Sequence, residues 1–158
     1  MSTLADDLPP LLETVVAVLV ATSDGRLNPE VTRAWGLRIL EDGETVSVGL
    51  DRAASQQTLE NLRIDNRVAL VGINLAMVAR QLKGRCIEIG KPTYEDAAAI
   101  AAHRELFLKT GTEYNIPEQV SRRYWSDDVV SLRCRIDEVF DQSPGPEAGR
   151  SLSDRTCP

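Results

Sequence analysis

The sequence has 158 residues, of which 42% are hydrophobic and 27% are charged, and its formal net charge is -6 at pH 7. This composition excludes an intrinsically disordered chain, and the length fits one domain of ordinary size. The negative charge argues against non-specific nucleic-acid binding, which requires a basic surface. Of the 18 basic residues only three are lysines, and arginine is the better residue for anchoring a specific anion. GC-rich coding would produce the same bias, so composition alone does not establish an anion site.

The N-terminal segment is acidic and polar, unlike a secretory leader, and the longest apolar run, 15–21, is too short to cross a bilayer. We therefore expect a cytoplasmic protein with no membrane partner. The three cysteines are too widely spaced for a disulfide framework or a paired-cysteine metal site. Cys86 and Cys134 lie in strand-like runs and are interpreted as small core residues. No metal is expected.

The first 50 residues predict three consecutive strands. Residues 14–22 are a continuous apolar run rich in β-branched residues, which is typical of a strand buried on both faces. Residues 30–40 alternate, and one face of this second strand would carry Val31, Arg33, Trp35, Leu37 and Ile39. Asp42-Gly43 is a hairpin signal before a third strand over 45–50. We expect a three-stranded antiparallel meander.

The rest of the chain alternates between helical and strand patterns. In chain order it predicts a helix over 56–64 with Ser55 as its N-cap, strands over 67–73 and 77–89, a helix over 94–109 ended by Gly111, and a strand over 129–140. Gly84 is the expected bend in the fifth strand. Six strands and two helices predict a mainly β protein, a six-stranded antiparallel barrel with helices outside. We expect a single domain over 1–142 and a loop or disordered tail over 143–158.

Familiar catalytic motifs are absent from the sequence. It contains no glycine-rich dinucleotide fingerprint, P-loop, zinc-protease motif or serine-hydrolase elbow. The single histidine, His103, lies in the alanine-rich helical segment and is interpreted as a residue at the edge of the core. Hydrolase and metalloenzyme functions are therefore weak hypotheses, and no catalytic residue is identified.

Four segments in order carry a resemblance. They are Arg33-Ala34-Trp35-Gly36-Leu37-Arg38, the stretch 53–62 around Ser55-Gln56-Gln57, Arg80-Gln81-Leu82-Lys83-Gly84, and the closing stretch 139–146. Together they resemble the pyridoxamine 5'-phosphate oxidase-like family of FMN-binding split barrels, over roughly residues 10–142. The resemblance implies a six-stranded split barrel that forms a homodimer with two FMN sites at the interface. It also implies an oxidoreductase acting on an unknown small molecule.

The resemblance assigns the cofactor contacts residue by residue. The residues it places on FMN are Arg33, Ala34, Trp35, Arg38, Val48, Gly49, Ser55, Gln56, Gln57 and Gln81. Arg33, Arg38 and Ser55 would bind the phosphate, Val48 and Gly49 would approach the flavin ring, and Gln81 would help to hold it. A regular strand would put Arg33 and Arg38 on opposite faces, so both reach one phosphate only around a bulge.

Some features leave other functions open. Gln56 and Gln57 stand where the family usually has a basic residue. This replacement favours an alternative function, a non-enzymatic flavin or haem carrier or a stress protein, in which the cofactor site is degenerate. A deazaflavin-dependent enzyme is a third possibility. The pyridoxamine phosphate oxidase reaction itself is not expected, because the chain is short and lacks the substrate-phosphate residues. Trp35 is also interpretable as a core or interface residue, and Gln81 as part of an outward strand face.

Overall fold

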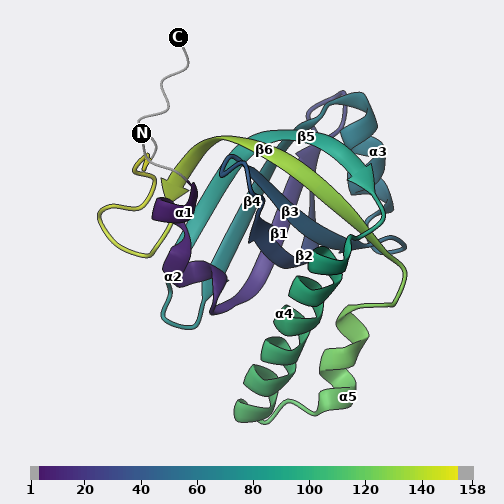
Figure 1. Ribbon diagram of the computed structural model, residues 1–158, viewed down its shortest axis with the longest axis vertical. Helices are drawn as coiled ribbons and strands as arrows, with labels where there is room; N and C mark the ends of the chain where they lie inside the picture. The colour runs from purple at the N-terminus through teal and green to yellow at the C-terminus, as the bar shows by residue number, and fades with distance from the viewer. Residues whose placement is uncertain (1–3, 153–158) are drawn as a thin grey trace.

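The computed structural model describes residues 4–152, which form a closed antiparallel barrel (Figure 1). Its strands are β1 (Val15–Ser23), β2 (Pro29–Ile39), β3 (Thr45–Asp51), β4 (Arg67–Asn74), β5 (Ala79–Gly90) and β6 (Val129–Asp141). They close in the order β1-β2-β3-β6-β5-β4. This confirms the expected six-stranded antiparallel barrel and its opening meander. A register shift at Lys83/Gly84 between β5 and β6 coincides with the expected bend.

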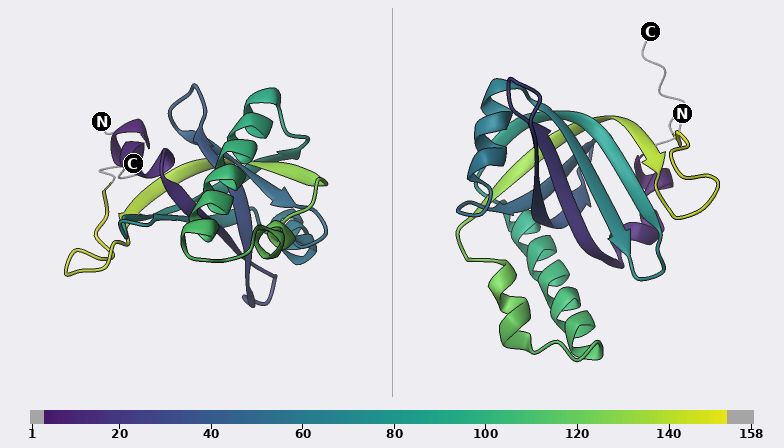
Figure 2. Two further views of the ribbon diagram at one scale, coloured as in Figure 1. Left: turned by 90° about the horizontal axis from the view of Figure 1, so that it is seen from below. Right: turned by 180° about the vertical axis from the view of Figure 1, so that it is seen from behind.

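The helices lie outside the barrel and at its ends. They are α1 (Leu4–Asp7), α2 (Pro9–Leu12), α3 (Gln56–Ile64), α4 (Tyr94–Glu113), α5 (Glu118–Ser121) and the 3-10 helix η1 (Arg122–Tyr124). The prediction included only α3 and α4. In Figures 1 and 2, α1 and α2 lie at one end of the barrel and α3 at the other. Within the described residues, no helix is both long and apolar enough to cross a membrane.

The predicted end of α4 at Gly111 is wrong. The helix continues to Glu113, and Gly111 is buried inside it. A Cβ at Gly111 would lie 2.8 Å from Ser121 Oγ, so the glycine allows α5 to pack closely against α4. A packing requirement, and not helix termination, explains this glycine.

The interior of the barrel is filled by aliphatic side chains that alternate inward from every strand. The largest fully buried ones on the strands are Val18, Val20, Val46, Val48, Leu50, Leu70, Leu82 and Leu132. Leu8 and Leu11 at one end and Leu59 and Leu62 at the other belong to the same cluster.

A β-bulge interrupts β2 and corrects the expected alternation. The pairing of β2 with β3 shifts register between Trp35 and Arg38, and Gly36 has a φ of 67°. Leu37 consequently faces the core instead of sharing a face with Arg33. Trp35 precedes the bulge and shares the outward face of Arg33. The extra residue puts Arg38 on that same face, which a regular strand would not allow.

Helix α4 lies along this outward face of β2 (Figure 2). Two glycines allow the close approach: a Cβ at Gly36 would lie 2.5 Å from the Ile100 backbone nitrogen, and one at Gly49 would lie 2.5 Å from Ile100 Cδ1. The helix begins with a capping box in which Thr93 and Asp96 satisfy each other's backbone N–H groups.

The segment after β6 folds back onto the barrel. Ser151 forms an isolated antiparallel bridge with Phe140, and Leu152 packs against the core. Apart from this bridge, residues 143–152 form turns and bends. The remainder of the predicted tail, including Cys157, lies outside the described residues.

Candidate functional site

An aromatic cluster joins β2, α4 and the segment after α5. Its members are Trp35, Phe107, Tyr124 and Trp125. The ring centroids of Trp35 lie 5.4 Å from Phe107 and 5.0 Å from Trp125, and Phe107 lies 5.5 Å from Tyr124, all edge to face. Trp35 faces out of the barrel, on the same side of β2 as Arg33, and α4 with Trp125 buries it completely. The cluster is therefore an aromatic layer outside the barrel, with Trp35 buried beneath it and Tyr124 exposed at its edge.

Arg33 lies within this aromatic cluster. Its guanidinium carbon is 4.9 Å from the ring centroid of Phe107, 5.3 Å from that of Trp35 and 5.4 Å from that of Tyr124. Within the described chain, its buried Nη1 has no hydrogen-bond partner, and no carboxylate lies within ion-pair distance. Burial lowers the pKa of Arg33, and interaction with Tyr124 opposes this. Cation–π contacts hold this guanidinium, and among residues 4–152 no carboxylate neutralises it.

Arg38 has a different environment. Its guanidinium forms a 2.7 Å ion pair with Asp96, a residue only 2% exposed, and donates to Thr93 Oγ1 at 3.4 Å. Burial alone would raise the pKa of Asp96, but hydrogen bonds from Thr93, Arg38 and Ser47 and the charge of Arg38 hold it at about 2. This ion pair fastens the start of α4 to β2.

The two arginines do not converge within one chain. Arg38 contacts Asp96 and Arg33 contacts Phe107, and these helix positions are separated by roughly 16 Å at 1.5 Å per residue. They share a face of β2 but lie at opposite ends of its contact with α4. A single phosphate therefore cannot contact both in the described structure.

The residues expected beside the flavin ring are covered. Ala34 and Val48 point into the barrel and are 0% and 1% exposed. Trp35 lies beneath α4, and Ile100 packs directly on Gly49. The outer face of β2 and β3, between Arg38 and Arg33, is thus occupied by the chain's own helix.

Ser55 lies at the N-cap position of α3, but its side chain does not cap the helix. Its Oγ instead lies 3.1 Å from Thr32 Oγ1, beside Arg33 in the sequence. Gln56 and Gln57 are exposed, and Gln57 Nε2 donates to Asn61 Oδ1 at 2.8 Å. The preceding loop is held by the Asp51 carboxylate, which accepts from the backbone N–H groups of Ala54 and Ser126.

Gln81 lies on the other side of the barrel. It is on β5, which is three strands away from β2 in either direction around the barrel. Its Oε1 accepts from Gln142 Nε2 at 3.3 Å. Within one chain, Gln81 therefore does not belong to the group around Arg33.

Arg104 and His103 on α4 also lie beside Trp35, and the sequence alone did not place either of them near Arg33. Arg104 stacks on Trp125 at 5.2 Å and donates to the Ser126 carbonyl, while its buried Nε has no hydrogen-bond partner among the described residues. His103 Nδ1 accepts from the Gly36 N–H at 3.1 Å. Burial lowers the pKa of His103 to about 4, and the charges of Arg33 and Arg104 act in the same direction.

The sequence did contain a signal for this helix face. Four of the α4 residues that meet β2 are Asp96, Ile100, His103 and Phe107, at spacings of four, three and four. This spacing places them on one stripe of a helix. The stripe mixes charged, apolar and aromatic residues, so a search for apolar periodicity alone does not find it.

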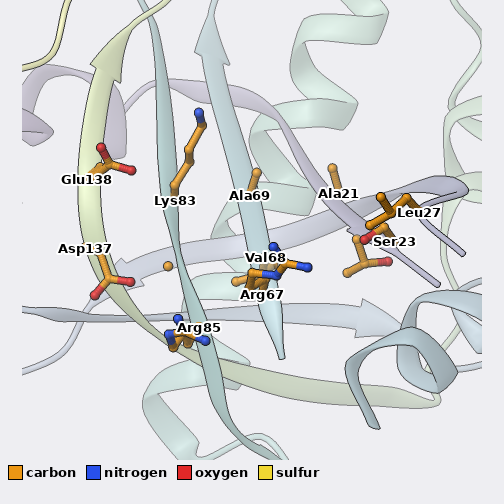
Figure 3. Close-up of a pocket in the computed structure, with 12 residues that line it drawn as sticks. Ala21, Ser23, Leu27, Arg67, Val68, Ala69, Lys83, Arg85, Asp137 and Glu138 are labelled. Carbon is orange, nitrogen blue, oxygen red and sulfur yellow. The ribbon is translucent and has the colours of Figure 1, made fainter. Parts of the chain in front are cut away.

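A separate open basin of about 420 Å³ spans β1, β4, β5 and β6 (Figure 3). Its charged side chains are Arg67, Lys83, Arg85, Asp137 and Glu138. Mixed charges give it no field of one sign, and no predicted cofactor residue lines it. Within residues 4–152, no three His, Cys, Asp or Glu side chains are grouped so as to hold a metal ion.

No family model and no curated protein matches the chain. Solved structures do match. HupZ from Group A Streptococcus is 16% identical, with 94% of this chain and 100% of that chain covered and a TM-score of 0.54. An FMN-binding protein from Syntrophomonas wolfei is 12% identical, with 87% and 85% covered and a TM-score of 0.55. An F420 reductase is 18% identical, with 82% and 93% covered and a TM-score of 0.50.

At sequence identities this low, the similarity to solved structures shows the fold and nothing about function. The likeness to these structures, one of which is an FMN-binding protein, shows a shared split-barrel fold. The expected split-barrel fold class is confirmed.

Proposed function

We propose that this chain binds FMN through its phosphate at Arg33 and serves as a flavin-dependent oxidoreductase for a small molecule. The observation that carries the proposal is the guanidinium of Arg33, which is partly buried, held among three aromatic rings and not paired with a carboxylate. A phosphate would supply the charge-assisted partner that Nη1 lacks. The split-barrel fold, shared with an FMN-binding protein, supports FMN as the source of that phosphate.

The chain fits the two ends of FMN unequally. At the phosphate end, the Ser55 hydroxyl contacts Thr32, the residue before Arg33 on β2, and Gln56 carries an exposed amide. At the ring end, α4 covers Trp35 and Gly49. We therefore assign the phosphate to Arg33 and do not assign the ring to β2 and β3.

A homodimer is part of the same proposal. Leu19 is the register neighbour of Arg33 and is 40% exposed, and nearby Val31 is 55% exposed. An apolar surface beside an unpaired cation suits an interface that closes over a bound anion. Because Gln81 lies opposite β2 in one chain, only Gln81 of the partner subunit can approach the cofactor held by Arg33.

FMN, when bound, supplies the hydride and electron chemistry of the reaction. The chain's own contribution is binding and orientation. Arg33 neutralises the phosphate, and the aromatic cluster fixes its guanidinium and excludes water from one side. His103 is buried, and its Nδ1 already accepts a hydrogen bond from Gly36, so we give it no proton-transfer role.

Comparing FMN with riboflavin tests the phosphate assignment, because only FMN carries a phosphate. We expect the wild-type chain to bind FMN more tightly than riboflavin. Arg33→Ala should lower the FMN affinity by roughly 10- to 100-fold and leave the riboflavin affinity unchanged. Arg122→Ala is the matched control, because Arg122 is an exposed arginine in an i,i+4 pair with Glu118.

Two results would contradict the proposal. Equal FMN affinity of Arg33→Ala and wild type would remove Arg33 from the site. Colourless purified protein that shows no thermal shift with FMN would remove the cofactor altogether. Arg38→Ala should destabilise the fold without changing the preference for FMN over riboflavin, since Arg38 is already paired with Asp96.

The second candidate function is a non-enzymatic flavin or haem carrier. Coverage of Trp35 and Gly49 by α4 favours it, because little of the expected ring site is open to a substrate. The visible spectrum of protein purified without added cofactor separates flavin from haem. Steady-state oxidation of nicotinamide cofactors by the flavin-loaded protein separates an enzyme from a carrier. Competition between FMN and F420 tests the deazaflavin alternative.

A further inference from the structure

Cys86 on β5 and Cys134 on β6 lie directly opposite each other across the sheet. Both belong to the core cluster inside the barrel, and both are free thiols. Of the chain's three cysteines, these two are therefore neighbours although 48 positions separate them in the sequence.

The backbone pattern shows what kind of pair they form. The Cys86 N–H donates to the Asn66 carbonyl, away from β6, and the Ile136 N–H donates to the Glu44 carbonyl, away from β5. Residues two apart in a strand direct their backbone N–H and C=O groups to the same neighbouring strand, so those of Cys134 also point to β3 and away from β5. The two cysteines therefore form a non-hydrogen-bonded antiparallel pair, in which the Cα atoms are about 4.5 Å apart and the side chains approach most closely.

This spacing lies within the range that a disulfide spans, since bridged Cα atoms are roughly 4.4–6.8 Å apart. The thiols already interact: a hydrogen bond with Cys134 lowers the pKa of Cys86, and the same contact together with burial raises the pKa of Cys134. Cys86 is 7% exposed and Cys134 is 0% exposed. Cys86 is thus the thiol that ionises and meets solvent first.

We propose that Cys86 and Cys134 are a redox-active dithiol that closes to a cross-strand disulfide when a low-molecular-weight disulfide acts as oxidant. The Cys86 thiolate attacks one sulfur of the oxidant, which forms a mixed disulfide and releases one thiolate. Cys134 loses its proton and attacks the Cys86 sulfur, which releases the second thiolate. The two cysteines are oxidised by two electrons in total, and the oxidant is reduced to two thiols.

The bridge would act on the region around Arg33. It closes the chain from 86 to 134 into a covalent loop, and this loop contains α4, α5 and three members of the aromatic cluster. The register of β5 shifts between Cys86 and Glu88, so the strand is already irregular where the bond would form. Oxidation should therefore make it harder for α4 to separate from the barrel.

The test is to incubate the folded, full-length chain with oxidised glutathione, block the remaining thiols and map the peptides by mass spectrometry. We expect a Cys86–Cys134 linked peptide, the loss of two free thiols and a higher urea midpoint than for the reduced chain. Cys157→Ser is the matched control and should behave as wild type does. Cys86→Ser and Cys134→Ala should each abolish the link and the shift in midpoint.

Peptide mapping of the wild-type chain decides the matter even if a core variant folds poorly. Three free thiols after treatment would overturn the proposal. So would modification confined to Cys157, whether as a glutathione adduct or as a bond between two chains.

Discussion

Substitution of Gly36 by alanine tests whether α4 is seated on the bulge of β2. Gly36 has a φ of 67°, and its added Cβ would lie 2.5 Å from the Ile100 nitrogen and 2.8 Å from the Ala99 carbonyl carbon. These are backbone atoms of a helix and cannot swing aside. Restoring an ordinary contact of 3.4 Å requires α4 to move by about 0.9 Å.

Gly43 supplies a matched control. Its φ is 68°, and a Cβ there would meet nothing within 4 Å. Both substitutions incur the strain of a left-handed residue, roughly 1–2 kcal/mol. Only Gly36→Ala adds the clash, and overpacking of this kind costs about 1–3 kcal/mol. The expected difference between the two variants is therefore about 1–3 kcal/mol in the free energy of unfolding.

The assay is urea unfolding followed by far-ultraviolet circular dichroism, with the midpoint and slope compared between the two variants. A lower midpoint for Gly36→Ala at an unchanged slope is the expected result. Equal midpoints for the two variants would refute the reasoning, because they would mean that α4 does not press on Gly36.

The other predictions concern single contacts. His103 has a pKa of about 4 in the fold, against 6.5 for an ordinary histidine, so the unfolded chain binds the extra proton first and stability falls as the pH drops from 6.5 towards 4. The loss should reach about 3 kcal/mol, and a pH series of urea midpoints should lose this slope in His103→Gln. Asp96→Asn leaves Arg38 facing a neutral amide and should cost about 1–3 kcal/mol of unfolding free energy, and less in an Arg38→Ala background. Leu19→Glu should convert the proposed dimer to a monomer, measured by light scattering, and an unchanged mass would exclude this face.

Most of the barrel could be predicted from the sequence because its signals are local. The β-branched run of β1 and the turn at Asp42-Gly43 each specify structure within a few residues. Short helices such as α1 and α5 have four residues each and no periodicity that marks them. Their positions depend on tertiary packing.

The candidate site could be predicted only in part because its contacts are non-local. Arg33 and Arg38 are both recognisable on β2, but their environments are set by Phe107 and Asp96, more than 50 positions away. A glycine within a strand is a signal for a bulge, and the expected alternation overlooked it at Gly36. The sequence shows which cations are present, whereas only the fold shows which one is already paired.

The separation of aliphatic from aromatic residues has an experimental consequence. Both tryptophans, Trp35 and Trp125, lie in the cluster between β2, α4 and the segment after η1, while the described core inside the barrel is purely aliphatic apart from its two cysteines. Intrinsic tryptophan emission should therefore report the attachment of α4 and be insensitive to the barrel interior. If the emission changes before the strand signal is lost, the helix leaves first and unfolding is not two-state. Coincident transitions would mean that the outer layer and the barrel form one cooperative unit.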